Sequence, residues 1–148
     1  LPTDARFEAY GLADLAKSLE AVSVKQWQPG CEQREANIQT AAQANIAIAF
    51  AEFLLAESGT IVVESNAGQG RALHFLPKHY ISIIPFSKLV PRSTQPAAFY
   101  TDKIEKGEKI GSAIHFISGP SNSGDIEMQL VVGLHGPLEV CYVVVMNR

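Results

Sequence analysis

The stretch that most constrains the fold is residues 111–145, where two apolar segments flank a loop of small residues. Residues 113–117 and 139–145 have the length and the β-branched content of strands. Between them, three apolar residues spaced four apart would line one face of a short helix: Ile126, Leu130 and Leu134. A strand, a helix and a second strand form a βαβ unit, whose strands are parallel and buried on both faces. The stretch therefore predicts a parallel sheet covered by helices.

The loop SGPSNSGD at 118–125 is the first candidate binding site. In the predicted unit it follows a strand and precedes a helix, where ligands of open α/β sheets bind. Its glycines leave backbone N–H groups accessible to an anion, either a carboxylate or a phosphate. The alternative is that Asn122 or Ser123 only caps the helix. If the loop binds a ligand, the contacting residues are Ser118, Gly119, Ser121, Ser123 and Gly124.

The rest of the chain alternates between helical and extended patterns. Apolar spacing and helix-forming composition predict helices at 6–22, 32–44, 50–56, 71–76 and 94–106. Short β-branched or apolar runs predict strands at 46–49, 61–64, 80–84 and 87–90. This alternation predicts a single α/β domain over residues 1–148, built as a three-layer sandwich with a mostly parallel sheet.

Composition excludes several classes of protein. The 148 residues are 47% hydrophobic and 18% charged, which is typical of one globular domain. A net charge of −3 argues against a nucleic-acid partner, because no basic stripe is present to neutralise phosphates. No apolar run is long enough to span a membrane and no signal-peptide pattern opens the chain, so we expect a cytoplasmic protein.

The cysteines and histidines limit the metal chemistry of the chain. Cys31 and Cys141 are the two cysteines, without CxxC spacing, whereas an iron–sulfur cluster needs about four thiolates. Cys141 lies within an apolar segment and is expected to be buried. His74, His79 and His115 lie in or beside apolar segments and are interpreted as structural. Because no histidine spacing typical of a zinc site occurs, no metal site is predicted.

Several motifs occur in an order that resembles one known family. SGPSNSGDIE at 118–127 and GLHGP at 133–137 are similar to the C-terminal signature of the lactate-utilization protein C family, the LUD domain family. Upstream, LAESGTIVV at 55–63, GRALHFLP at 70–77 and SKLVP at 87–91 match in the same order. The resemblance covers the chain from Trp27 to Val145.

This resemblance implies a NagB/RpiA/CoA-transferase-like fold and a role in oxidising L-lactate to pyruvate. It also implies iron–sulfur partner proteins that carry the clusters, with no cofactor in this chain. Members of the family usually carry an additional N-terminal helical segment, which we expect to be missing from residues 1–148. Two alternatives stay open: an acyl- or CoA-transferase-like enzyme that uses Glu57, and a regulatory or interaction module without catalysis.

Four side chains in predicted turns are the other candidate functional groups. Glu57 is a candidate base or nucleophile, or it hydrogen-bonds turn N–H groups. Arg71 has the planar guanidinium that binds carboxylates, or it pairs with Glu57 or Glu64. Asp125 is a candidate base that would also stabilise the helix dipole, and His135 is either a proton carrier or a turn histidine. Since functional groups of α/β proteins gather in turns at strand ends, we expect all four at one rim.

Overall fold

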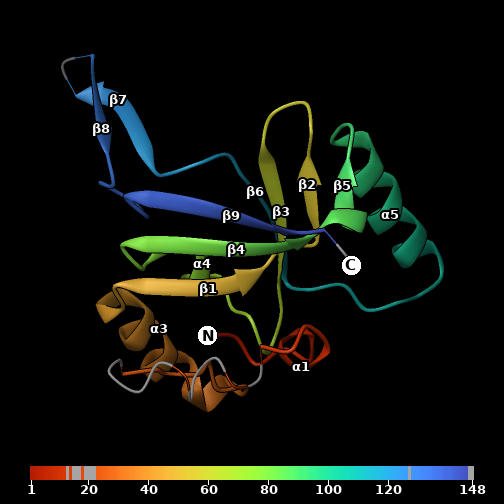
Figure 1. The fold of residues 1–148 in the computed structure, drawn as a ribbon, viewed down its shortest axis with the longest axis horizontal. Helices are drawn as coiled ribbons and strands as arrows, with labels where there is room; N and C mark the ends of the chain where they lie inside the picture. The colour runs from red at the N-terminus through yellow and green to blue at the C-terminus, as the bar shows by residue number, and fades with distance from the viewer. Residues whose placement is uncertain (13, 15–17, 19–22, 127, 147–148) are drawn as a thin grey trace.

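The computed structural model describes residues 1–12, 14, 18, 23–126 and 128–146. Its central element is sheet A, in which three strands are parallel and ordered β1–β4–β9 (Figure 1). These strands are β1 (Ile46–Phe50), β4 (His79–Pro85) and β9 (Glu139–Val145). The prediction of an α/β fold with a mostly parallel sheet is confirmed by this sheet and its helices.

Sheet B is smaller, and its strands are ordered β5–β2–β3–β6. It consists of β2 (Phe53–Leu55), β3 (Thr60–Ser65), β5 (Leu89–Val90) and β6 (Ala113–Ile117). β3 is antiparallel to both β2 and β6, and β2 is parallel to β5. β2 follows β1 after a two-residue bend in which the Ala51 N–H donates to the Ile83 carbonyl and the Glu52 N–H donates to the Val62 carbonyl. The two sheets are therefore joined through the ends of β1 and β4.

Helices pack beside both sheets (Figure 1). α3 (Arg34–Gln43) follows a 3-10 turn, Cys31–Gln33, and contacts α4 (Ala72–Phe75), which also contacts β1. α5 (Thr94–Glu105) follows a second 3-10 turn, Phe86–Lys88, and β5, and it lies beside sheet B. The short α1 (Arg6–Ala9) places Phe7 against Phe50, with ring centroids 5.1 Å apart. Among the described residues, no helix is long and apolar enough to cross a membrane.

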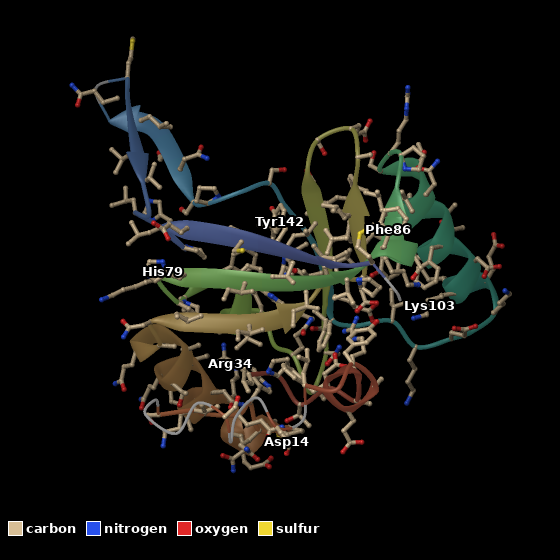
Figure 2. All side chains as sticks on the ribbon, in the orientation of Figure 1. Asp14, Arg34, His79, Phe86, Lys103 and Tyr142 are labelled. Atoms are coloured by element: carbon tan, nitrogen blue, oxygen red, sulfur yellow. The ribbon has the colours of Figure 1, made fainter. Side chains whose placement is uncertain are left out.

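The main core fills the space between sheet A, sheet B and α4. Side chains from both sheets meet there, and Tyr142 of β9 lies between β9 and β6 (Figure 2). A second cluster packs Phe53, Leu55 and Val62 of sheet B against Tyr100 of α5. The buried members of the main cluster are Ala47, Ala49, Ala51, Ile61, Val63, Leu73, Tyr80 and Ile84.

A glutamine extends the hydrogen bonding of sheet A beyond its outer strand. Gln69 is fully buried, and its Oε1 accepts from the Phe50 N–H at 3.1 Å while its Nε2 donates to the Phe50 carbonyl at 3.0 Å. The amide therefore pairs with β1 as a neighbouring peptide would, and it satisfies backbone groups that would otherwise be buried without partners. This contact fixes the loop between β3 and α4.

Two predicted helices are strands. Residues predicted as a helix at 50–56 contain β2, and the predicted helix after the small-residue loop is an antiparallel ribbon of β7 (Asn122–Ile126) and β8 (Gln129–Val132). A spacing of four residues, as between Leu130 and Leu134, is also a multiple of the two-residue repeat of a strand, so it does not distinguish the two. The predicted βαβ unit is also wrong, because a ribbon replaces its helix and its two strands belong to different sheets, β6 to sheet B and β9 to sheet A.

Other predictions have mixed outcomes. Predicted elements at 32–44, 46–49, 61–64, 71–76, 80–84 and 94–106 correspond to α3, β1, β3, α4, β4 and α5. The predicted 6–22 helix begins with α1, Ser18 is also helical, and most of residues 13–22 lie outside the described residues. Cys141 is exposed rather than buried, because its neighbours Val140 and Tyr142 occupy the face of β9 that packs against the main core.

Candidate functional site

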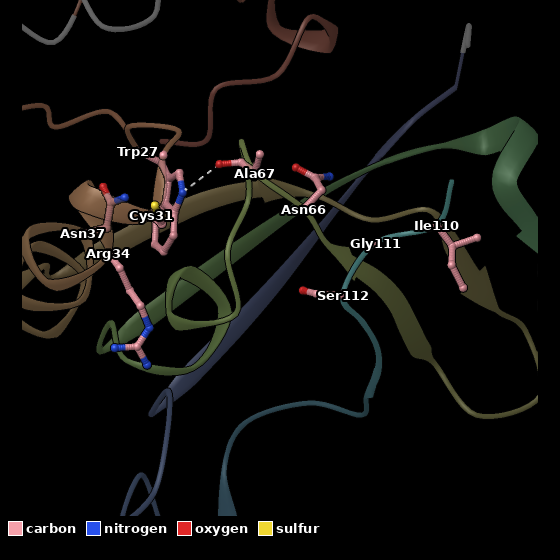
Figure 3. A pocket seen from close by; sticks show the side chains of 10 residues that line it. Trp27, Cys31, Arg34, Asn37, Asn66, Ala67, Ile110, Gly111 and Ser112 are labelled. Carbon is pink, nitrogen blue, oxygen red and sulfur yellow. Dashed lines mark hydrogen bonds between the residues drawn. The ribbon is translucent and has the colours of Figure 1, made fainter. Parts of the chain in front are cut away.

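A cavity of about 610 Å³ opens between the start of α3 and the end of sheet B where β3 ends and β6 begins. Trp27, Cys31, Arg34 and Asn37 line one side, and the loop after β3 and the segment before β6 line the other (Figure 3). We call this cavity the Trp27 pocket. Its other lining residues are Gly30, Asn66, Ala67, Ile110, Gly111 and Ser112.

Trp27 connects the two walls of the pocket. Its indole Nε1 donates at 3.1 Å to the carbonyl of Ala67, which belongs to the β3–α4 loop (Figure 3). Its ring lies against Gly70 so closely that a Cβ atom on Gly70 would overlap it. Glycine at position 70 therefore allows the indole to cover the loop that leads into α4.

The segment before α3 is held in place by a buried asparagine. Asn37 is 7% exposed, and its Oδ1 accepts from the Gln28 N–H at 3.0 Å while its Nδ2 donates to the Gln28 carbonyl at 2.7 Å. Gly30 then turns the chain with φ 118°, a left-handed value that favours glycine. These contacts place Cys31 and Arg34 on the pocket wall.

The pocket presents few polar groups. Arg34 is exposed, and its guanidinium has no hydrogen-bond or ion-pair partner within the described part of the chain. Asn66 uses its Oδ1 to accept the Gly68 N–H at 2.9 Å, which leaves its amide donors directed elsewhere. Ser112 donates from Oγ to the Ser65 carbonyl at 3.3 Å. At the rim, the Cys31 thiol lies 3.7 Å from the Glu32 carboxylate. One cation, small polar donors and apolar walls can bind an anionic ligand.

Two histidines lie behind the Ser112 wall. The Nε2 of His115 is 3.2 Å from the hydroxyl of Ser65. The Nδ1 of His74 is 2.8 Å from the hydroxyl of Tyr80, and its Nε2 has no partner among the described residues. Phe75 lies between them, with ring centroids 5.2 Å from His115 and 6.3 Å from His74. Ser65 thus connects the pocket to a buried polar cluster.

Burial and charge keep this cluster neutral. Desolvation, followed by the charge of His115, lowers the pKa of His74 to about 3. Desolvation, followed by the charge of Arg71, lowers the pKa of His115. Burial raises the pKa of the Tyr80 hydroxyl above its ordinary value. His74 is therefore an uncharged imidazole at neutral pH, a hydrogen-bonding group and not a cation.

Glu57 lies in the turn between β2 and β3, away from the Trp27 pocket. Its Oε1 accepts the Ser93 N–H at 2.9 Å, next to the start of α5, and its own N–H donates to the Pro91 carbonyl. This is the structural alternative, in which the carboxylate satisfies a backbone N–H group near a helix start. A catalytic role for Glu57 stays a prediction.

The first residues of the small-residue loop are brought beside this turn. The Ser118 Oγ is 2.5 Å from the Oγ1 of Thr60, which is itself 2.7 Å from the Ser58 hydroxyl. The Gly119 N–H donates to the Tyr142 hydroxyl at 3.0 Å. The ESGT and SGPS motifs therefore meet in space, although they are far apart in the sequence.

The second half of the loop lies at the base of the β7–β8 ribbon. The Ser121 N–H donates to the Pro137 carbonyl, and its Cβ lies 3.0 Å from where a Cβ of Gly136 would be. Ser123, Gly124 and Asp125 belong to β7. Since no helix follows the loop, the helical N–H donors that motivated an anion site are absent here. Ligand contacts of Ser118, Gly119, Ser121, Ser123 and Gly124 stay predictions.

The four residues expected at one rim are spread over several places. His135 is exposed in the connection between β8 and β9, and Glu57 lies in the β2–β3 turn, which is well separated from it (Figure 1). Arg71 precedes α4, close enough to influence the charge of His115. Asp125 lies on the ribbon. The four residues lie in loops and strands of different sheets, so they do not form one common site.

Sequence reasoning missed the residues of the Trp27 pocket. Arg34, Asn66 and Ser112 come from three segments, and no motif links them. The available signals were the PGC turn before α3 and the single tryptophan, Trp27. Among the described residues, no group of three or more histidine, cysteine or carboxylate side chains could hold a metal ion.

Comparison with known proteins gives a consistent family. The LUD domain family model matches residues 2–145. The chain is 52% identical, over 151 residues, to "Lactate utilization protein C" of Geobacillus kaustophilus strain HTA426, covering 100% of this chain and 62% of that protein. It is 45% identical, over 149 residues and with the same two shares, to the protein of that name from Bacillus subtilis strain 168. The chain thus spans 62% of the length of these relatives.

A solved structure has the same fold. A DUF162 family protein from Deinococcus radiodurans superposes with a TM-score of 0.54, over 94% of this chain and 91% of that chain. The two sequences are 16% identical, so this likeness concerns the fold alone.

Proposed function

The chain belongs to the LUD domain family, and from that premise we propose that it acts in lactate utilization, within a system that oxidises L-lactate to pyruvate. The observation that carries the proposal is the similarity to proteins named lactate utilization protein C along the whole of this chain. The similarity covers this chain, and we propose the same role for the whole protein.

The Trp27 pocket is the proposed binding site for lactate or pyruvate. The Arg34 guanidinium would pair with the carboxylate, since it is the pocket's cation and has no partner among the described side chains. The Asn66 amide and the Ser112 hydroxyl would contact the C2 oxygen. Trp27 and Ile110 would provide the apolar surface for the methyl group.

The electrons of this reaction need acceptors outside the chain. Oxidation of lactate to pyruvate releases two electrons and two protons, and side chains alone do not carry out that transfer. Two cysteines, Cys31 in the pocket wall and Cys141 on β9, do not fit a cluster that needs about four thiolates. We therefore assign the electron-accepting clusters to iron–sulfur partner proteins, as the family resemblance implies.

The ligand site is tested by calorimetric titration with L-lactate and pyruvate. Arg34→Gln should weaken carboxylate binding by about 10- to 100-fold, because a hydrogen bond to a charged group contributes about 1.5–3 kcal/mol. Arg92→Gln is the matched control, since Arg92 is an exposed arginine in the loop before α5 and outside the pocket. Equal affinities of the two variants would remove Arg34 from the site.

The pathway role is tested separately by growth on lactate. Cells that lack the full-length protein should fail to grow on L-lactate and grow normally on pyruvate, and the intact gene should restore growth. Affinity purification from lactate-grown cells should recover cysteine-rich iron–sulfur proteins. Normal growth of the deletion strain on lactate would overturn the pathway proposal, whatever the titrations show.

A further inference from the structure

The β7–β8 ribbon stands apart from the rest of the molecule (Figure 1). β7 and β8 form a separate two-stranded sheet, joined to the body through residues 118–121 and the connection to β9. A two-stranded hairpin without further packing is marginally stable in water. Packing against another surface would therefore stabilise the ribbon.

One strand of the ribbon exposes apolar side chains on an unprotected edge. Leu130 is 71% exposed and Val132 is 43% exposed, and Met128 just before β8 is 97% exposed. The four residues of β8, Gln-Leu-Val-Val, include no charge and no proline. Natural proteins normally place charged residues or proline on edge strands to prevent pairing with another chain. β8 has neither form of protection.

The backbone of β8 defines what can pair with it. The Gly133 N–H donates inward, to the Ser121 carbonyl, and Val131 and Val132 lie opposite Ser123 and Asn122 of β7. Backbone groups alternate in direction along a strand, so Val131 also faces β7. Leu130 and Val132 then direct their N–H and C=O groups to the outer edge, where a further strand can bind.

We propose that β8 pairs with β8 of a second copy of the chain, antiparallel and with the two-fold axis at Val131. In this register Leu130 of one copy lies opposite the partner's Val132, and both residues have outward backbone groups. Each exposed apolar side chain gains an apolar cross-strand neighbour, which stabilises antiparallel pairs. The two ribbons become one four-stranded sheet. This inference is independent of the proposed role in lactate utilization.

The oligomeric state is the first test, measured by sedimentation equilibrium over a wide range of concentrations of the full-length protein. The parent should change from monomer to dimer, and Leu130→Lys should shift that transition to at least ten-fold higher concentration. Ile104→Lys is the matched control, because Ile104 is 58% exposed on α5, away from the ribbon. A parent that is monomeric at every concentration, or a control that weakens the dimer equally, overturns the proposal.

The register is tested by disulfide cross-linking in a background with Cys31→Ser and Cys141→Ser, since both native thiols are exposed. The two copies of Val131 would form a non-hydrogen-bonded pair, with Cα atoms roughly 4.5 Å apart, which suits a disulfide. Val131→Cys should therefore cross-link under mild oxidation. In Gln129→Cys the two sulfurs would be separated by four residues along the strand, roughly 14 Å, and should not cross-link.

Two results of this experiment would contradict the proposal. Equal cross-linking at positions 129 and 131 would mean random collision. No cross-linking at position 131, with β8 amides protected from hydrogen exchange in a monomer, would mean that another part of the full-length protein covers the ribbon.

Discussion

β4 and β9 lie side by side in sheet A and have similar sequences, yet they have very different environments. HYISIIP of β4 and EVCYVVV of β9 are both rich in β-branched residues, and they pair in parallel over seven residues. From Ser82 onward β4 is buried, whereas β9 alternates between exposed and half-buried positions. In the register pair Ile84–Val144, Ile84 is 0% exposed and Val144 is 36% exposed.

The difference comes from what packs around each strand and not from their composition. β4 lies between β1 and β9, so both of its edges are paired, and its inward face packs against α4 and sheet B. β9 has β4 on one side and no strand of sheet A on the other. A β-branched run therefore predicts a strand, while its burial is decided by neighbours that come from distant parts of the chain.

The largest expected effect comes from substitutions at the opposed pair Ile84 and Val144 on β4 and β9. Ile84→Ala should lower the free energy of unfolding by about 3 kcal/mol, since it removes fully buried methyl groups and leaves a cavity. Val144→Ala, directly opposite on β9, should cost about 1 kcal/mol or less. Urea unfolding of both variants measures the two values. Equal losses would mean that β9 is covered in the folded protein.

The second prediction concerns the buried imidazole that packs on β4. The pKa of His74 is about 3 in the folded state and about 6.5 in the unfolded state, so below pH 6.5 the unfolded chain binds the additional proton. The contribution of neutral His74 to the free energy of unfolding should be fully present above that pH. The free energy of unfolding should fall as the pH decreases, by about 2 kcal/mol between pH 7 and pH 5.

Replacement of the imidazole isolates this contribution. His74→Gln should remove most of the slope of stability between pH 7 and pH 5, measured by urea unfolding at several pH values. His79→Gln serves as the control, because His79 is a partly exposed histidine at the start of the same strand. A slope that survives in His74→Gln would assign the acid sensitivity to other groups.

The smallest expected effect is at the first register pair of the two strands. The His79 Nδ1 lies 3.2 Å from the Glu139 carboxylate, with side chains 40% and 78% exposed. Exposed ion pairs contribute little, so Glu139→Gln should change the free energy of unfolding by about 0.5 kcal/mol or less. Thermal unfolding at low and high salt checks this. A loss above about 1 kcal/mol would show that the amino end of β9 is held by this pair.

Much of the fold could be predicted because local patterns and tertiary contacts agree there. A helix is predicted and found at α5, where Tyr100 packs against sheet B, and β3 is a β-branched run buried on both faces. The pattern fails at Phe53–Leu55, where a helix-compatible run becomes β2 because the turn after it allows pairing with β3. It also fails at β8, where period four suits a strand as well as a helix.

The candidate site could be predicted far less well. Glu57 and His135 stood out because of their motifs, but the structure gives Glu57 a backbone partner and leaves His135 exposed. Arg34 had no distinguishing signal, because its position in a pocket depends on Asn66 and Ser112, which come from other parts of the chain. A pocket of this kind is a property of the tertiary structure and not of any segment.

The packing of Trp27 makes the pocket observable by optical spectroscopy. Trp27 is the only tryptophan of the 148 residues, and it contributes to the pocket wall while its indole Nε1 donates to the Ala67 carbonyl. The tryptophan fluorescence of this chain therefore originates next to the proposed ligand site. Ligand entry, or movement of the β3–α4 loop that breaks the indole hydrogen bond, should change the emission maximum and the quenching by iodide. This chain thus carries its own probe of ligand occupancy, without a dye or a label.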